Sequence, residues 1–195
     1  MTPRLLSAAV LMPTLVLFAA AQEPAKKDPP KEGKTIKAPD GWVFHTNKDK
    51  LTTYLLPKER KGSASSEGSM SKDGLTGKTQ VTSYELTDGR ELTVIIVKLG
   101  GPKLKELKVG DVHDMAYEAD QEPGAKLSEP ADFKVSERLS GKEYYVTKRG
   151  EAMRVVALVT RDARLVKLVV TAPTKAKTQD KVADTFLHSL ILRNP

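Results

Sequence analysis

The sequence predicts an α+β fold: a three-layer α/β/α sandwich with a largely antiparallel sheet and one main helix on each face. Three observations support this prediction. Consecutive strand patterns are joined by short turn sequences, which is typical of antiparallel hairpins. Only two segments show helical periodicity, and they lie far apart in the chain. Several strands are apolar on both sides, so each side of the sheet requires a covering layer.

Residues 1–21 precede this domain and have the features of a secretory signal peptide. Arg4 gives a positive start, an apolar run follows, and Ala19-Ala20-Ala21 is a small-residue cleavage site. An uncleaved membrane anchor is disfavoured because Pro13 interrupts a run that is short for crossing a bilayer. We therefore expect export, a mature chain that begins at Gln22, no membrane span after cleavage, and a secreted or periplasmic location.

Residues 22–38 are expected to form a disordered linker. They consist mainly of Pro, Lys and Glu, with Ile36 as the only large apolar side chain. Such a composition buries too little apolar surface to offset the entropy lost on ordering. The folded domain should therefore span residues 39–193. The chain has no cysteine, so this domain must be stabilised by packing without disulfides.

The domain begins with two predicted strands and a long insertion. The strands, 42–46 and 51–56, are separated by a polar turn, and Pro57 ends the second. Residues 58–78 are rich in Ser, Gly and Lys and show no periodicity, which predicts a flexible loop.

The remaining strand patterns follow in hairpins. Segments 79–87 and 90–99 flank Asp88-Gly89, a strong hairpin turn, and the second of them is apolar on both faces. The later strands are predicted over 131–139, 142–148, 151–160 and 165–171, with the first turn of this series at Ser140-Gly141.

Two segments have helical periodicity. Asp111 is the predicted N-cap of the first helix, and the second is predicted over 178–192. The apolar stripe of the first consists of Val112, Met115, Ala116 and Ala119. The stripe of the second consists of Val182, Ala183, Phe186, Leu187 and Leu190. Since several strands are apolar on both faces, we expect one helix on each side of the sheet.

Three segments of the chain resemble a known family. They are "APDGWVFHTNKDKLTTYLLP" (Ala38–Pro57), "YELTDGRELTVIIV" (Tyr84–Val97) and "RLVKLVVTAP…VADTFLHSLIL" (Arg164–Leu192). Together they resemble the PsbP-like superfamily, whose founding member is an extrinsic protein of the photosystem II oxygen-evolving complex; small exported bacterial proteins of unknown role also look similar. The resemblance implies an α/β/α sandwich, no shared catalytic residues, and function through binding of protein partners.

The net charge of +7 suggests mild affinity for anions, although 32 basic and 25 acidic residues are interspersed. Aromatic residues make up only 5% of the chain, which is too few for a surface that stacks nucleic-acid bases, so no nucleic acid is expected as a partner. The lack of cysteine excludes thiol nucleophiles and thiolate metal sites.

No sequence motif nominates a catalytic, cofactor-binding or metal-binding residue, and no cofactor is expected. A metal site at His113, Asp114 and Glu118 is one alternative, but a solvated polar helix face explains the same residues. His188 and His45 are explained by ordinary surface pairing and by strand packing. Tyr144 and Tyr145 should point to opposite faces of the sheet.

These observations lead to a non-catalytic exported domain that binds a protein or a cell-envelope component. The alternative is a hydrolase-like or metal-dependent enzyme, with a site assembled from dispersed polar residues near His113 and residues 58–78. A third possibility is electrostatic adhesion to anionic surface polymers. The sequence leaves the identity of the partner and the oligomeric state open.

Overall fold

The computed structural model describes residues 37–193, apart from residues 49, 73, 137–138 and 161. The expected signal peptide, 1–21, lies outside the described residues, and so does the expected linker except for its last two residues. Within the described ranges, no helix is long and apolar enough to cross a membrane.

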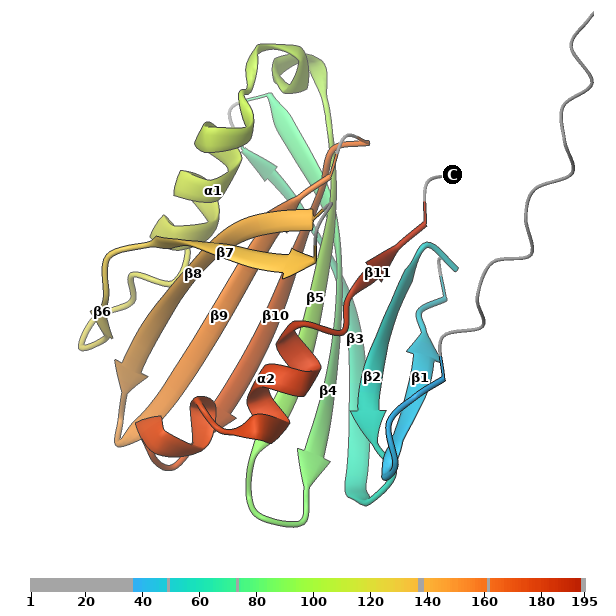
Figure 1. Ribbon diagram of the computed structural model, residues 1–195. Coiled ribbons are helices and arrows are strands. Elements are labelled where there is room, and N and C mark those ends of the chain that lie inside the picture. The colour runs from blue at the N-terminus through green and yellow to red at the C-terminus, as the bar shows by residue number, and fades with distance from the viewer. Residues whose placement is uncertain (1–36, 49, 73, 137–138, 161, 194–195) are drawn as a thin grey trace, which may run out of the picture. The chain divides into compact units, whose positions relative to one another are not determined.

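The described chain forms two sheets and two α-helices (Figure 1). The first strands are β1 (Trp42–Thr46), β2 (Thr52–Pro57), β3 (Arg60–Lys72), β4 (Leu75–Leu86) and β5 (Glu91–Gly100). The later strands are β6 (Lys126–Leu127), β7 (Ala131–Ser136), β8 (Leu139–Lys148), β9 (Glu151–Val159), β10 (Arg164–Ala172) and β11 (Ile191–Leu192). The helices are α1 (Val109–Glu118) and α2 (Lys181–Leu187), with short 3₁₀ turns η1 (Pro102–Glu106) and η2 (Lys175–Thr178).

The larger sheet is built from hairpins, in the order β3-β4-β5-β10-β9-β8-β6, with β7 also paired to β8. The smaller sheet has the order β1-β2-β11. The strand pairs of both sheets are antiparallel within the described residues. The predicted α+β class with a largely antiparallel sheet is therefore confirmed.

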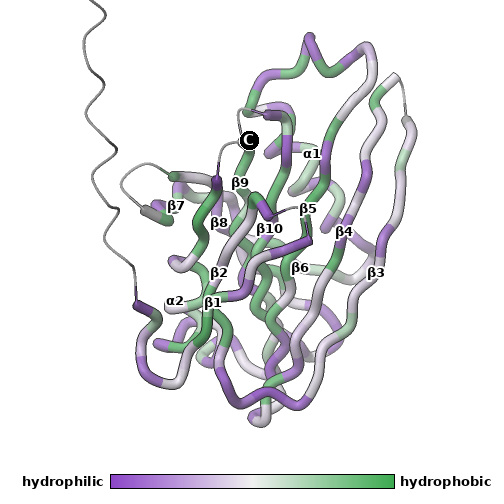
Figure 2. Tube along the Cα trace, turned by 90° about the vertical axis from the view of Figure 1, so that its right-hand side faces the viewer, coloured by the Kyte–Doolittle hydropathy of each residue, from purple (hydrophilic) through white to green (hydrophobic). Residues whose placement is uncertain are grey.

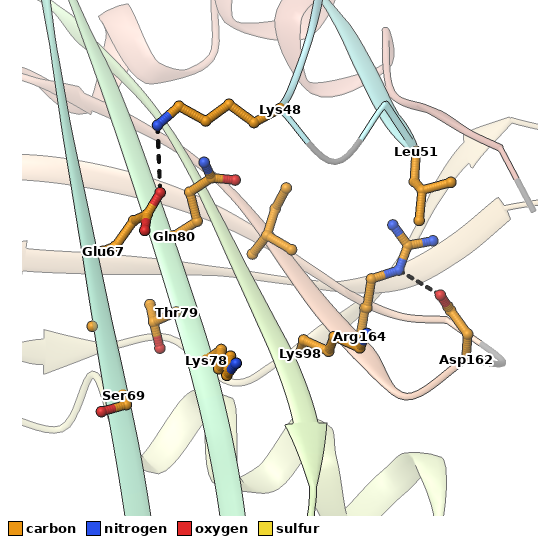
Figure 3. A pocket seen from close by; sticks show the side chains of 12 residues that line it. Lys48, Leu51, Glu67, Ser69, Lys78, Thr79, Gln80, Lys98, Asp162 and Arg164 are labelled. Atoms are coloured by element: carbon orange, nitrogen blue, oxygen red, sulfur yellow. Dashed lines mark hydrogen bonds and ion pairs between the residues drawn. The ribbon is translucent and has the colours of Figure 1, made fainter. Parts of the chain in front are cut away.

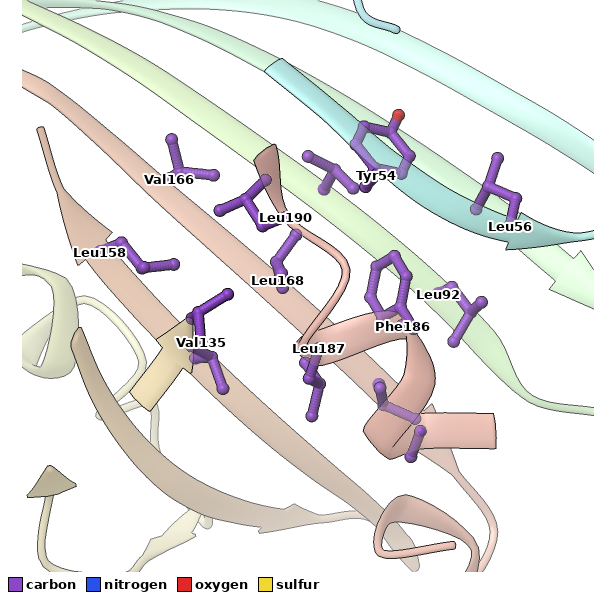
Figure 4. Packing of buried hydrophobic residues seen from close by; sticks show 14 of the residues in the cluster. Tyr54, Leu56, Leu92, Val135, Leu158, Val166, Leu168, Phe186, Leu187 and Leu190 are labelled. Carbon is purple, nitrogen blue, oxygen red and sulfur yellow. The ribbon is translucent and has the colours of Figure 1, made fainter. Parts of the chain in front are cut away.

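The larger sheet carries a hydrophobic cluster on each face. Alternate residues of β9 divide between the clusters: Val156 packs with Phe186 of α2, whereas Val155 packs with Val112 of α1. The first cluster also contains Tyr54 of β2, so α2 shares its face with the smaller sheet (Figure 4). The expected sandwich with one main helix on each face is not confirmed in that form, because the smaller sheet supplies much of one covering layer.

Residues 58–78 do not form the expected flexible loop. Most of them belong to the β3–β4 hairpin, and β3 is the edge strand of the larger sheet. The strand is exposed wherever its side chains are described, and Figure 2 shows it as mostly hydrophilic or neutral. A strand without a buried face has no reason to alternate apolar and polar residues, so periodicity could not reveal it.

The expected helix over 178–192 is also wrong in its extent. Asp180 caps α2 by accepting hydrogen bonds from the amides of Val182 and Ala183, and the helix ends at Leu187. Residues 191–192 instead form β11 and pair with β2. Between them, the Ser189 hydroxyl oxygen accepts a 2.8 Å hydrogen bond from the amide of Leu55, which diverts the chain toward β2.

Two further local expectations need correction. Lys108, and not Asp111, is the N-cap of α1; the Asp111 carboxylate accepts a 2.7 Å hydrogen bond from the Lys108 amide. Gly141 lies within β8 and not in a turn, since β7 ends at Ser136 and β8 begins at Leu139. There a glycine is required by close packing, because a Cβ atom would lie 2.2 Å from the carbonyl oxygen of Ala157.

Candidate functional site

A groove of about 640 Å³ lies at one end of the larger sheet (Figure 3). Its floor includes Ile96, a member of the same cluster as α2, so the groove opens on the α2 side of the sheet. The turn after β1 and the turn before β10 contribute its other walls. The lining residues are Lys48, Leu51, Glu67, Gly68, Ser69, Lys78, Thr79, Gln80, Ile96, Lys98, Asp162 and Arg164.

One row of side chains crosses this groove on four neighbouring strands. Ser69 of β3 is paired with Lys78 of β4, Lys78 with Lys98 of β5, and Lys98 with Arg164 of β10. Adjacent strands are about 4.8 Å apart, so the three cations are close neighbours. Like charges directly opposite each other destabilise a sheet. We refer to these four residues as the cationic row.

The charges of the cationic row are only partly neutralised. Arg164 is buried and its Nε lies 2.7 Å from Oδ2 of Asp162. Burial alone would raise the pKa of Asp162, but hydrogen bonds from Thr160 and Arg164 bring it below its ordinary value. Lys78 and Lys98 are exposed, and neither forms an ion pair with any residue that the structure describes. An anion placed between them would relieve their repulsion.

An ion pair joins the β1–β2 turn to β3 at the side of the groove. Nζ of Lys48 lies 3.4 Å from Oε1 of Glu67, and the two side chains are 80% and 68% exposed. Pairs this exposed contribute about 0–1 kcal/mol, so this contact can be exchanged at little cost.

A buried relay orients the amide of Gln80 in the groove. The Tyr54 hydroxyl donates to Oδ1 of Asn47 at 3.1 Å, and Nδ2 of Asn47 donates to Oε1 of Gln80 at 3.3 Å. Since the carbonyl of Gln80 is engaged, its amide NH₂ remains as a donor for the groove. Tyr84 supports the relay through a 2.9 Å contact between its hydroxyl and that of Tyr54. The groove therefore offers hydrogen-bond donors and positive charge.

The residues considered for a metal site do not form one. No three His, Cys, Asp or Glu side chains lie close enough to hold a metal ion in the part of the chain that the structure describes, which includes His113, Asp114 and Glu118. Nδ1 of His113 is buried without a hydrogen-bond partner among the described residues. Burial, followed by the charge of nearby Lys142, lowers the pKa of His113, and Asp114 opposes this shift.

The other two histidines pack against neighbouring rings. His188 contacts Phe133 at 4.7 Å between ring centroids, and its Nδ1 lies 2.9 Å from the Asp184 carbonyl oxygen. His45 packs against Tyr54 and Tyr84, and burial, with a smaller contribution from the charge of Arg60, lowers its pKa.

A second polar cluster joins α1 to the opposite face of the sheet. The Tyr144 hydroxyl donates to Oδ2 of Asp120 at 2.7 Å, and Nζ of Lys167 lies 2.6 Å from the same oxygen. Burial, reinforced by the Asp120 carboxylate, raises the pKa of Tyr144. Tyr145, as expected, points to the other face, where its ring lies 4.8 Å from Nζ of Lys175. Because the Asp120 cluster is internally paired, its geometry favours a structural role.

The cationic row was not predicted from the sequence. Lys78 belongs to the segment expected to form a loop, and Arg164 precedes the strand predicted over 165–171. The Asp88-Gly89 turn was the available signal, because a hairpin centred there brings Lys78 and Lys98 close together. The structure alone supplies their register and adds Arg164.

No protein-family model and no curated protein matches the chain. Among solved structures, the chain is similar to the solution structure of cyanobacterial PsbP (CyanoP) from Synechocystis sp. PCC 6803. The two are 16% identical, with a TM-score of 0.48, over 80% of this chain and 95% of the other. This is a similarity over most of both chains at low sequence identity. It carries no conclusion about activity or partners.

Proposed function

We propose that this protein is an exported, non-catalytic domain that binds an anionic component of the cell envelope through the groove that contains the cationic row. The observation that carries the proposal is the pairing of Lys78 with Lys98 across β4 and β5, two exposed lysines without an acidic partner among the described residues. Like charges on directly opposite residues destabilise a sheet. Such locally unfavourable arrangements are found mainly at functional sites.

The lining of the groove supports binding and gives no support to catalysis. The ammonium groups of Lys78 and Lys98 and the amide of Gln80 attract an anionic ligand and donate hydrogen bonds to it. Among the described lining residues there is no histidine, and the carboxylates of Glu67 and Asp162 are both paired with cations. This arrangement lacks a free general base beside a nucleophile.

Binding of fluorescent dextran sulfate to the purified protein tests the proposal, with neutral dextran as the negative ligand. We expect Lys78→Gln/Lys98→Gln to weaken the affinity for dextran sulfate about tenfold near 50 mM salt, since each lost charge–charge contact in water contributes about 1 kcal/mol. The affinity of the unaltered protein should fall steeply as the salt concentration rises.

Lys126→Gln/Lys134→Gln is the matched control. Both lysines are exposed and lie outside the groove, so this variant loses the same net charge. Its affinity should stay within about twofold of the unaltered protein, because the groove is unchanged. Equal losses in the two double variants would show that binding depends on net charge alone, and would overturn the proposal. Unchanged binding in Lys78→Gln/Lys98→Gln would do the same.

A further inference from the structure

The cationic row borders two hollows. Besides the groove of about 640 Å³, a second hollow of about 670 Å³ is lined by Ser69, Lys78 and Lys98, which also line the first. The second hollow extends along β3 and β4 to Ser71 and Thr76, which are paired across the two strands. The cationic row therefore stands between two open spaces and does not close off one small pocket.

The extent of this surface exceeds the size of a single small anion. Gln80 lines the first hollow and Thr76 lines the second, and they are separated by four residues along β4. At about 3.4 Å per residue, this separation is about 14 Å. A ligand that fills both hollows must therefore be a chain, with an anionic group above Lys78 and Lys98 and neighbouring units on either side.

The chemistry of the lining distinguishes between classes of chain. Each hollow lacks an aromatic side chain among its described lining residues, so bases of a nucleic acid find no stacking platform. An extended peptide binds by adding to the free edge of a sheet. The hollows instead lie across β3, β4 and β5, and free backbone groups are confined to the outer edge of β3, because β4 and β5 are paired on both sides.

Besides apolar side chains and the paired charges of Glu67, Asp162 and Arg164, the lining offers hydroxyls, an amide and ammonium groups. Hydroxyls such as those of Ser71 and Thr76 both donate and accept hydrogen bonds, which matches the hydroxyl groups of a sugar. Lys78 and Lys98 supply compact charges that accept carboxylate or sulfate without a fixed bidentate geometry. From these contacts, and resting on the proposed function, we infer that the groove binds a linear anionic polysaccharide, with one acidic group on the cationic row and adjacent sugar residues in the two hollows.

Galacturonic acid and oligogalacturonides of increasing length are suitable probes, with calorimetry of the purified protein as the readout. We expect a short oligomer to bind at least about tenfold more tightly than the monomer at equal carboxylate concentration, because linked contacts reinforce one another. The gain should level off once both hollows are filled. Equal affinity of monomer and oligomer would overturn the inference.

Ser71→Ala/Thr76→Val tests the second hollow without changing charge. Loss of two hydroxyls should weaken oligomer binding about tenfold, at about 1 kcal/mol for each hydrogen bond, and leave monomer binding within about twofold. Ser128→Ala/Thr147→Val, on exposed residues that line neither hollow, is the matched control and should change neither affinity. Unchanged oligomer binding in the Ser71/Thr76 variant would refute an extended site.

Poly-L-glutamate and single-stranded DNA of similar charge test the class of chain. Each should bind more weakly than the oligogalacturonide, and tighter binding of either would overturn the assignment to a polysaccharide. These outcomes are distinct from failure of the proposed function. If the groove does not bind anions at all, Lys78→Gln/Lys98→Gln retains its affinity for dextran sulfate, whereas a wrong ligand class leaves that loss intact.

Discussion

Replacement of Gly141 by alanine should destabilise the domain through a clash between the added Cβ atom and the backbone of the neighbouring strand. Gly141 lies in β8, and an added Cβ would lie 2.2 Å from the carbonyl oxygen of Ala157 and 3.0 Å from Cγ of Leu158. Both neighbours belong to β9, which is paired with β8 over most of its length. A backbone carbonyl cannot rotate away as a side chain can, so the strands must separate locally.

The size of the effect follows from this separation. Ordinary contact begins near 3.4 Å, so the 2.2 Å contact requires a shift of about 1 Å. A shift of this size weakens one or two backbone hydrogen bonds of the β8–β9 ladder, and buried groups left without partners cost about 1–3 kcal/mol each. Alanine restricts the unfolded chain and returns about 0.5–1 kcal/mol. The net loss of stability should be about 3 kcal/mol.

Chemical denaturation at equilibrium measures this loss directly. The same destabilisation should lower the melting temperature by about 6–12 °C for a domain of this size. Gly68→Ala is the control, because Gly68 has no atom within 4 Å of its Cβ position and lies on the exposed strand β3. The control should remain within about 1 kcal/mol of the unaltered protein. A Gly141→Ala protein as stable as the control would refute the close approach of β8 and β9.

Three further changes test the packing and the charges of the domain. Phe186→Ala should cost about 4 kcal/mol in denaturant unfolding, because the side chain is fully buried in the α2 cluster, and a loss below about 1 kcal/mol would contradict that packing. Arg154→Ala should cost about 3 kcal/mol, since it leaves the largely buried carboxylate of Glu143 unpaired; Arg154→Ala/Glu143→Gln should recover part of this loss. A hydrogen bond from the Arg90 side chain holds the pKa of Asp88 below 3.8. Asp88 therefore contributes stability above its unfolded pKa that is lost as the pH falls toward its lower folded value, and Asp88→Asn should reduce the decline in melting temperature below about pH 4.

The sequence alone determined those features that depend on neighbours a few residues away. The strand over 42–46 was predicted with the bounds that the structure shows, because a Gly-containing turn and a polar turn enclose it. The stripe of Ala183, Phe186 and Leu187 was predicted to face the sheet, and all three residues are buried. Such patterns record which side of an element meets the core, since burial selects apolar residues at the period of the element.

The sequence could not predict elements that lack a periodic pattern of buried apolar residues. β3 is exposed, so nothing in its composition distinguishes it from a loop. The end of α2 depends on a hydrogen bond between Ser189 and Leu55, which are 134 residues apart. Local propensity does not contain a contact between such distant residues, and tertiary packing therefore decided where the helix stopped.

In the candidate site, the turn at Asp88-Gly89 separates what the sequence predicts from what the tertiary structure decides. The Asp88-Gly89 pair predicted the hairpin, but a two-residue turn would place Lys78 opposite Leu99. In the structure the Leu86 amide donates to the Arg90 carbonyl at 2.8 Å, so three residues form the turn and Lys78 lies opposite Lys98. A shift of one residue exchanges the faces of a strand. Sequence determined that these strands pair, and only the tertiary structure decided their register, which aligns the charges of the cationic row.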